Sequence, residues 1–271
     1  MTDSPHTSNE PTLRQLFDLT GKVSLITGAS GHLGSSLARA LAEAGSRVVV
    51  TSRDAQRAEQ AARALSDEKG VGHVGIVLDH MDEASIETGF AEVVRQVGHV
   101  DVLVNNGNEA CGSDWTTVTG DEFNRQLANV TGYFVLSRLV RNLAVERKAP
   151  ASIVMLGSMY GLVASYPDAY ADVCAASPAG YHALKGGVIH LTRHLAVYWA
   201  EDRVRVNCLS PGPFPSEAAP GEMVERLIQR SPMKRMGQPH ELKGVLLLLA
   251  SDAGSYLTGQ NIVVDGGWTA W

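Results

Sequence analysis

The sequence has few cysteines and no long hydrophobic run, and each shortage excludes a class of protein. Its three cysteines, Cys111, Cys174 and Cys208, are far apart and odd in number, so neither a disulfide framework nor a zinc site is expected. The longest apolar run, 245–250, has six residues, whereas a membrane span needs roughly 20. We therefore expect reduced thiols and no membrane partner.

Positive charge is also scarce. The chain has 23 Lys and Arg against 29 Asp and Glu, a net charge of −6, which argues against a nucleic acid as partner. The first residues lack the basic and apolar regions of a secretory signal, so a cytoplasmic location is expected. Hydrophobic residues at 44% and charged residues at 19% are ordinary for a globular protein.

Short β-branched runs alternate with longer helical patterns after a polar stretch, 1–12, that we predict to be a disordered tail. Strands are expected at 23–27, 47–51, 74–78, 100–104, 152–156, 204–209 and 261–264. Helices are expected at 33–45, 54–69, 83–97, 121–145, 180–200, 222–229 and 240–251. Apolar runs without alternation are typical of parallel strands buried on both faces. The pattern predicts an α/β fold, with residues 13–271 forming one domain around a doubly wound parallel sheet of about seven strands.

A glycine-rich loop, Thr27 to Gly34, lies between the first predicted strand and the first predicted helix. Glycines there let the backbone approach a pyrophosphate, and the helix N-terminus favours its negative charge. The loop therefore predicts a dinucleotide site. The alternative is a tight strand–helix turn that binds nothing.

Tyr181 and Lys185 are four residues apart at the start of a predicted helix, which puts them on one face. A tyrosine hydroxyl has an ordinary pKa near 10, too high for a good base at neutral pH. A neighbouring ammonium favours the phenolate, so we expect Lys185 to lower the pKa of Tyr181.

Four motifs occur in the order typical of one family. They are the Thr-Gly-x-x-x-Gly-x-Gly pattern from Thr27, Asn105-Asn106-Gly107, Tyr181-x-x-x-Lys185 and Pro211-Gly212. From Phe17 to the C-terminus the chain resembles the short-chain dehydrogenase/reductase family. The resemblance implies a Rossmann-like fold with helices on both faces of the sheet, and an oxidoreductase that moves a hydride between NAD(P) and an alcohol or ketone carbon.

The resemblance also implies roles for individual residues. Tyr181 would exchange the proton, Lys185 would hold the nicotinamide ribose, Ser158 would bind the substrate oxygen, and Asn129 would support a water relay. The residues expected to bind the cofactor are Gly28, Ser30, Gly31, His32, Leu33, Gly34, Ser52, Arg53, Asp79, His80, Asn105, Gly107, Tyr181, Lys185, Pro211, Gly212 and Ser216.

The loop departs from the family at one position, because His32 stands where the family has its middle glycine. Its side chain either contacts the cofactor or faces solvent. Specificity for NAD needs a carboxylate at the end of the second strand, and this chain has Ser52 followed by Arg53. A guanidinium can pair with a 2′-phosphate, so NADP is favoured over NAD. Asp79 is expected to accept from the adenine amino group.

Two further segments are expected near the substrate. Residues 162–179 lengthen the gap between Ser158 and Tyr181 and read as an inserted loop, and 213–230 as a substrate lid. The resemblance extends to members that act on sugars, sugar acids or polyols, and the polar residues expected to suit a polyol are Tyr166, Asp168, Tyr170, Glu109 and Asp114. His190 and His194 are four residues apart but lack a third ligand, so no metal is expected.

The two longest predicted helices carry apolar residues on more than one face. A surplus of this kind marks an interface. Together with the aromatic C-terminus, Trp268 to Trp271, it predicts a homotetramer with two kinds of two-fold contact. Two other functions stay open: a nucleotide-sugar epimerase or dehydratase, which shares Tyr-x-x-x-Lys, and a non-catalytic NAD(P)-binding protein.

Overall fold

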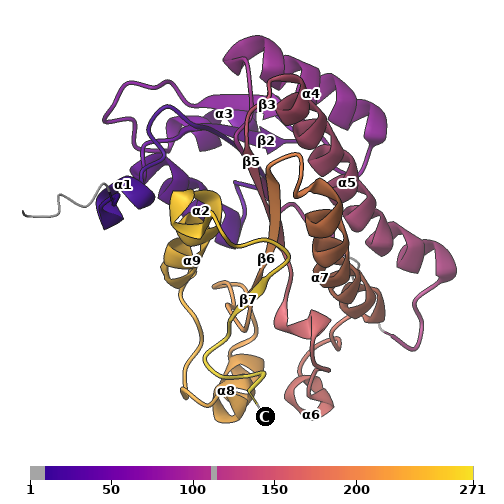
Figure 1. Cartoon of the computed structure of the whole chain (residues 1–271). Coiled ribbons are helices and arrows are strands. Elements are labelled where there is room, and N and C mark those ends of the chain that lie inside the picture. The colour runs from indigo at the N-terminus through magenta and orange to yellow at the C-terminus, as the bar shows by residue number, and fades with distance from the viewer. Residues whose placement is uncertain (1–9, 111–114, 271) are drawn as a thin grey trace, which may run out of the picture.

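The structure, a computed structural model, describes residues 10–110 and 115–270 and is built around one parallel sheet (Figure 1). Seven strands lie in the order β3-β2-β1-β4-β5-β6-β7. Their bounds are Val23–Thr27 (β1), Arg47–Ser52 (β2), Val74–Val77 (β3), Val102–Asn105 (β4), Ala151–Leu156 (β5), Val204–Pro211 (β6) and Asn261–Val264 (β7). All neighbouring pairs are parallel. The predicted fold class is confirmed.

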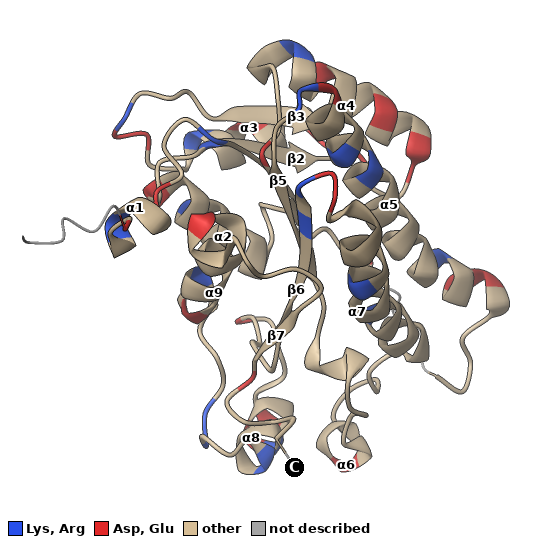
Figure 2. Ribbon diagram, in the orientation of Figure 1, with Lys and Arg blue, Asp and Glu red and all other residues tan. Residues whose placement is uncertain are grey.

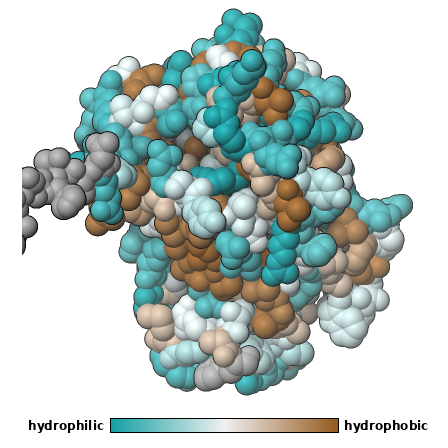
Figure 3. Space-filling view, in the orientation of Figure 1, coloured by the Kyte–Doolittle hydropathy of each residue, from teal (hydrophilic) through white to brown (hydrophobic). Residues whose placement is uncertain are grey.

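Helices cover both faces of the sheet (Figure 1). One apolar cluster packs the sheet against α4 (Glu83–Val97), α5 (Gly120–Glu146) and α7 (Ala179–Trp199). A second packs the other face against α2 (His32–Glu43), α3 (Ala55–Arg63) and α9 (Lys243–Ala250). Hydrophobic residues near the middle of the face in Figure 3 lie over α9, whose Val245 and Leu247 are partly buried. Every residue of β1 and β5 is buried, which explains why their sequences do not alternate.

Local sequence sets the helix boundaries. The side chains of Asp54 and Asp82 cap α3 and α4, and Thr119 forms a capping box with Glu122 at the start of α5. The predicted helix 54–69 ends early, at Arg63. The chain turns soon afterwards, where the Asp67 carboxylate accepts two backbone N–H groups.

Two short helices were missed, and one corrects the predicted tail. Thr12, assigned to a disordered segment, is the N-cap of α1 (Leu13–Leu16), and its side chain pairs with Gln15. Residues 1–9 lie outside the described part of the chain. The other missed helix, α6 (Pro167–Tyr170), lies within the predicted insert. Four residues are too few to show helical periodicity.

A third apolar cluster lies beyond the carboxyl ends of the strands. It combines α6, α8 (Gly221–Arg230) and the 3₁₀ turn Met159–Gly161 with the C-terminal segment. Trp268, predicted to form a subunit interface, is only 3% exposed and packs in this cluster. The prediction is wrong for Trp268, because the tertiary fold buries its indole within the subunit, and Trp271 lies outside the described residues.

Lys, Arg, Asp and Glu are interspersed over the outer helices, and Figure 2 shows no large region of one sign. Cys174 and Cys208 are free thiols, whereas Cys111 lies outside the described residues. No helix among the described residues is long and apolar enough to cross a membrane, and these residues contain no group of three or more His, Cys, Asp or Glu placed to hold a metal.

Candidate active site

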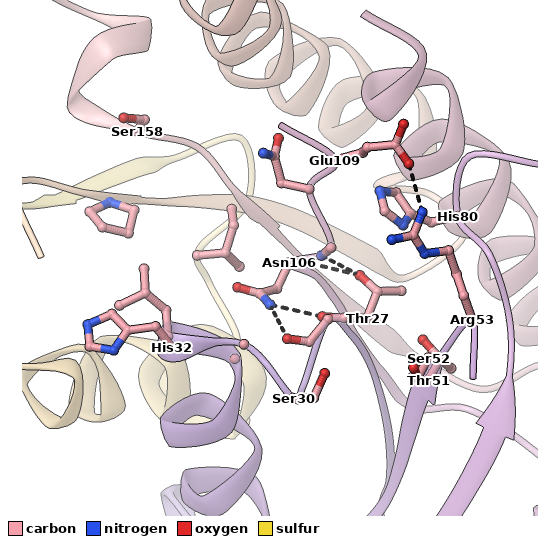
Figure 4. Close-up of a pocket in the computed structure, with 18 of the residues that line it drawn as sticks. Thr27, Ser30, His32, Thr51, Ser52, Arg53, His80, Asn106, Glu109 and Ser158 are labelled. Atoms are coloured by element: carbon pink, nitrogen blue, oxygen red, sulfur yellow. Dashed lines mark hydrogen bonds and ion pairs between the residues drawn. The ribbon is translucent and has the colours of Figure 1, made fainter. Parts of the chain in front are cut away.

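A cleft of about 530 Å³ opens at the carboxyl ends of β1 and β4, where the strand order reverses (Figure 4). Open α/β sheets bind their ligands at such a switch point. Most of the predicted cofactor and catalytic residues line this cleft: Gly28, Ser30, Gly31, His32, Leu33, Gly34, Ser52, Arg53, His80, Gly107, Ser158, Tyr181, Lys185, Pro211 and Gly212.

Hydrogen bonds join the two strand ends beneath the cleft. The Thr27 hydroxyl accepts from the backbone N–H groups of Asn106 and Gly107, at 3.0 and 2.8 Å. The Asn106 amide donates to the carbonyl oxygens of Thr27 and Gly28 (Figure 4). These contacts fix the glycine loop against the loop that follows β4.

The glycine loop is held by two glycines that leave no room for a side chain. Gly28 has a φ of +66°, and a Cβ on Gly34 would lie 2.1 Å from the Gly28 carbonyl oxygen. His32 is different, because it begins α2, is exposed and lines the cleft. A side chain therefore fits where the family has its middle glycine.

The lining of the cleft fits a dinucleotide. No side chain caps the N-terminus of α2, so its first amide groups keep their capacity to bind an anion at the positive end of the helix. Arg53 and Arg57 lie at one end of the cleft, and Tyr181 and Lys185 at the other. The loop amides would hold a diphosphate, and the arginines would hold a phosphate on the adenosine ribose.

Three predicted cofactor residues do not line the cleft. Asn105 is fully buried and donates to core atoms that include the Ser137 hydroxyl. The Asp79 carboxylate, expected at an adenine, accepts the Met81 N–H instead. Ser216 is exposed in the turn before α8. Asn105 ends β4, and Asp79 and Ser216 follow β3 and β6, but none of the three lines the cleft.

The start of α7 brings the predicted catalytic residues together. Ser158, just after β5, lines the same cavities as Tyr181, and its hydroxyl accepts the Tyr160 N–H at 3.1 Å. Lys185 is 4% exposed, and its Nζ donates to the Leu156 carbonyl oxygen at 2.7 Å. Burial lowers the pKa of Lys185 from 10.5 to about 8.

The predicted lowering of the Tyr181 pKa is wrong for this structure. Burial raises the pKa of Tyr181, and the bond from Ser158 only partly opposes this. The Lys185 Nζ lies 5.5 Å from the centre of the Tyr181 ring and is engaged by the Leu156 carbonyl. Its position on the same helix face therefore does not put the ammonium on the hydroxyl.

The Asn129 side chain, expected to support a water, is fully engaged with protein groups. Its Oδ1 accepts from the Glu109 N–H at 2.7 Å and from His80 Nε2 at 2.9 Å. Its Nδ2 donates to the carbonyl oxygens of Glu109 and Gln126. An amide has four such positions, so this side chain positions the loop after β4 and has none left for a water.

A second cavity of about 400 Å³ adjoins Ser158 and Tyr181. The predicted insert contributes Tyr170, Ser177 and Pro178 to its lining, and the predicted lid region contributes Met223 and Leu227. No Lys, Arg, Asp or Glu among the described residues lines it. Asp168 and Tyr166, expected here, instead contact Arg230 on α8, and Asp114 lies outside the described residues.

Two hydroxyls meet at the rim of this second cavity. Tyr160 Oη and Tyr170 Oη are 2.6 Å apart, and the Tyr160 ring stacks on His182 with centroids at 4.7 Å. On the outside of the cavity, Arg226 of α8 donates to the carbonyl oxygens of Asp168 and Ala171. The insert and α8 thus form one continuous wall.

Sequence reasoning missed Arg57 and the position of Glu109. Arg57 lies on the first turn of α3 and lines the cleft beside Arg53. Glu109 was assigned to the substrate, but its carboxylate pairs with Arg53 at 2.9 Å at the other end of the cleft (Figure 4). Helical spacing from the β2 end could have indicated Arg57, whereas nothing local pairs residues 53 and 109.

A cleft at the switch point next to a partly buried tyrosine and a buried lysine is typical of a dinucleotide-dependent oxidoreductase. A family model described as enoyl-(acyl carrier protein) reductase matches residues 28–269. Galactitol 2-dehydrogenase (L-tagatose-forming) of Cereibacter sphaeroides is 36% identical over 95% of this chain and 99% of its own length. NADP-dependent mannitol dehydrogenase of Alternaria alternata is 34% identical over 94% of this chain and 95% of its own length.

A solved structure agrees with these matches. Gluconate 5-dehydrogenase of Burkholderia cenocepacia, in complex with NADP and tartrate, superposes with a TM-score of 0.85 at 30% identity, covering 95% of this chain and 99% of that one. The chain belongs to the short-chain dehydrogenase/reductase family. It is an NAD(P)-dependent oxidoreductase.

Proposed function

We propose that this enzyme interconverts a neutral polyol and the corresponding ketose, using NADP in preference to NAD. The observation that carries the substrate class is the second cavity. Its described lining offers hydroxyl and amide groups but no charged side chain. Every Lys and Arg of the chain lies within the described residues, so the remaining residues add no lysine or arginine that could pair with a substrate carboxylate. Burying an unpaired carboxylate is costly, which disfavours sugar acids.

The residues beside the cavity have different roles in the proposed reaction. In the oxidation, the substrate hydroxyl gives its proton to Tyr181 Oη while Ser158 holds the oxygen, and the carbinol carbon loses a hydride. A nicotinamide held in the cleft would supply the hydride acceptor for this oxidation and the hydride donor for the reduction. The buried Lys185 ammonium keeps positive charge near the tyrosine, and Asn129 positions the loop that lines the cleft.

Burial raises the pKa of Tyr181, so its hydroxyl is protonated at neutral pH. A protonated tyrosine is ready to donate to a ketone, whereas oxidation needs the phenolate. We therefore expect ketose reduction at neutral pH and an oxidation rate that increases as pH rises.

The cofactor preference is supported by two arginines and the absence of a carboxylate at the end of β2. Arg53 and Arg57 line the cleft there, next to Ser52. Arg53→Ala and Arg57→Ala should each weaken NADP binding and leave NAD binding nearly unchanged. Because Arg53 is 65% exposed, we expect a loss of about 1 kcal/mol for this residue. Equal losses for both cofactors would contradict the assignment.

The substrate class is tested by turnover with both cofactors. Galactitol, mannitol and arabinitol are compared with gluconate, and the matching ketoses are tested in reduction. The proposal expects polyols and ketoses to be substrates and gluconate to be at least tenfold poorer in kcat/KM. Preferred turnover of gluconate would overturn it.

We also propose that the chain is a homotetramer in which α5 and α7 form one two-fold contact. Val197 and Tyr198 on α7 are 76% and 70% exposed, and Val145 on α5 is 40% exposed. Exposed apolar residues on adjacent helices favour an interface. Light scattering at micromolar concentration measures the mass. A single species near 29 kDa would contradict both the contact and the tetramer, and a dimer would contradict the tetramer alone.

A further inference from the structure

The Glu109 carboxylate lies between two arginines that come from different parts of the chain. Its Oε2 is 2.9 Å from Nη1 of Arg53, which follows β2. Its Oε1 is 2.6 Å from Nε of Arg125 on α5. In Figure 4 the Glu109 side chain reaches towards Arg53 across the end of the cleft. These bonds hold the pKa of Glu109 below its ordinary value, Arg125 being the main cause.

The backbone of Glu109 is fixed independently of its carboxylate. The Glu109 N–H donates to Asn129 Oδ1, and its carbonyl oxygen accepts from Asn129 Nδ2 and Gln126 Nε2. Three backbone bonds to α5 therefore hold the carboxylate at this end of the cleft. Removing the charge should not release the loop.

The three charges differ in their access to a ligand. Arg53 and Glu109 both line the cleft, whereas Arg125 does not. Arg57 lines the cleft too, and has no ion pair within the described part of the chain. The Glu109 carboxylate therefore offsets the charge of Arg53, and Arg125 offsets part of the Glu109 charge. Asp54 also lines the cleft, where its carboxylate accepts the Arg57 N–H at the start of α3.

We propose that Glu109 determines how strongly the enzyme distinguishes a 2′-phosphate from a 2′-hydroxyl on the cofactor. Its carboxylate competes with the phosphate for the Arg53 guanidinium and repels the phosphate charge, so it weakens binding of NADP and leaves NAD unaffected. Arg125 is a positioning residue that acts only through Glu109. This inference rests on the proposed function, which assigns the adenosine ribose to Arg53 and Arg57.

The first test measures the binding of NADP, NAD and 2′,5′-ADP to Glu109→Gln by titration calorimetry at low salt. An exposed ion pair contributes up to about 1 kcal/mol, which is roughly fivefold in affinity. NADP and 2′,5′-ADP should bind about three- to fivefold more tightly, and NAD should change less than 1.5-fold. Glu83→Gln, which removes an exposed carboxylate paired with Arg138, is the control and should change neither.

The second test separates this ion-pair role from general electrostatics. Arg125→Gln should weaken the binding of NADP, because the Glu109 carboxylate is then free to bind Arg53 fully. This effect is opposite in sign to that of Glu109→Gln. The double variant should bind NADP as Glu109→Gln alone does. Additive effects of the two changes would show that Arg125 acts through space and not through Glu109, and would overturn that part.

Other outcomes identify which proposal fails. If Glu109→Gln leaves NADP binding unchanged or weakens it while Arg53→Ala reduces it, the Glu109 inference is wrong and the cofactor assignment stands. If Arg53→Ala and Arg57→Ala both leave NADP binding unchanged, the assignment of the 2′-phosphate to these arginines is wrong. Thermal unfolding of each variant checks that the fold is retained.

Discussion

The two cavities that meet at Tyr181 are built in different ways. The cleft at the switch point is lined by loops that directly follow strands, and its far end carries Arg53, Arg57 and Glu109. The cavity beside Ser158 is walled by the insert and by α8, and its described lining is uncharged. Charge is present where a charged ligand is expected, and is absent where burial would make an unpaired charge costly.

The difference also lies in how the two walls are held. Close backbone packing of Gly34 against Gly28, together with the Thr27 hydroxyl bonded to the backbone after β4, fixes the cleft. Side chains fix the other cavity, through the Tyr160–Tyr170 pair and the bonds of Arg226. Substitutions in the cleft should therefore change cofactor binding, and substitutions in the second cavity should change substrate binding.

The largest effect is expected where the cavities meet. Tyr181→Phe removes the proton donor but keeps the ring, so kcat should fall by about 10²–10⁴-fold while NADP binding stays within about twofold. Steady-state kinetics and a binding titration measure the two. Tyr256→Phe, at a fully exposed tyrosine that lines neither cavity, is the matched control. Near wild-type turnover by Tyr181→Phe would remove the catalytic assignment.

Lys185→Met should separate activity from stability. Burial lowers the lysine pKa to about 8, so the unfolded chain binds more protons between pH 8 and 10.5. The buried lysine therefore lowers the unfolding free energy of the wild type by the full amount below pH 8, and by progressively less as the pH rises towards 10.5. The variant should lose turnover, and its stability relative to wild type should be higher at pH 7 than at pH 10.5 by on the order of 2 kcal/mol.

Urea unfolding at the two pH values measures this difference. The hydrogen bond to Leu156 is lost in the variant at every pH, so it does not contribute to the change between them. A stability difference that is the same at pH 7 and pH 10.5 would show that the lysine is not buried in its charged form.

Gly34→Ala should damage the cleft and spare the other cavity. The added Cβ would lie 2.1 Å from the Gly28 carbonyl oxygen, and overpacking of this kind costs about 1–3 kcal/mol. We expect lower unfolding free energy and weaker binding of both NAD and NADP. In Gly244→Ala the new Cβ meets nothing within 4 Å, so this helical control should retain normal binding.

Tyr170→Phe should affect only the substrate cavity, and its effect should be the smallest of the four substitutions. It removes the partner of the Tyr160 hydroxyl and one hydroxyl from the cavity lining. A lost neutral hydrogen bond is worth about 1 kcal/mol, so KM for a polyol should rise about fivefold with little change in kcat or in NADP binding. Tyr166→Phe, outside the cavity lining, should leave KM unchanged. If KM rose equally in both variants, the rise would not come from the hydroxyl that lines the cavity.

Features that are local in sequence could be predicted from it. Strand β1 and helix α4 have the predicted bounds, because continuous apolar runs and capping residues act within a few positions. The glycine loop and the Tyr181–Lys185 pair were recognised for the same reason, whereas Ser158 was identified from the family resemblance. Each is a short motif that begins or follows an element, and the parallel sheet brings the carboxyl ends of its strands to one edge.

What the tertiary structure alone decided depends on residues far apart in the chain. Glu109 was expected at the substrate but pairs with Arg53, 56 positions away. Trp268 was expected at an interface but is buried against the cluster that includes Met159 and Leu227. The Tyr181 pKa was expected to fall, but burial raises it. Partner choice, burial and desolvation are set by how distant segments pack, and the spacing of residues along the chain does not encode them.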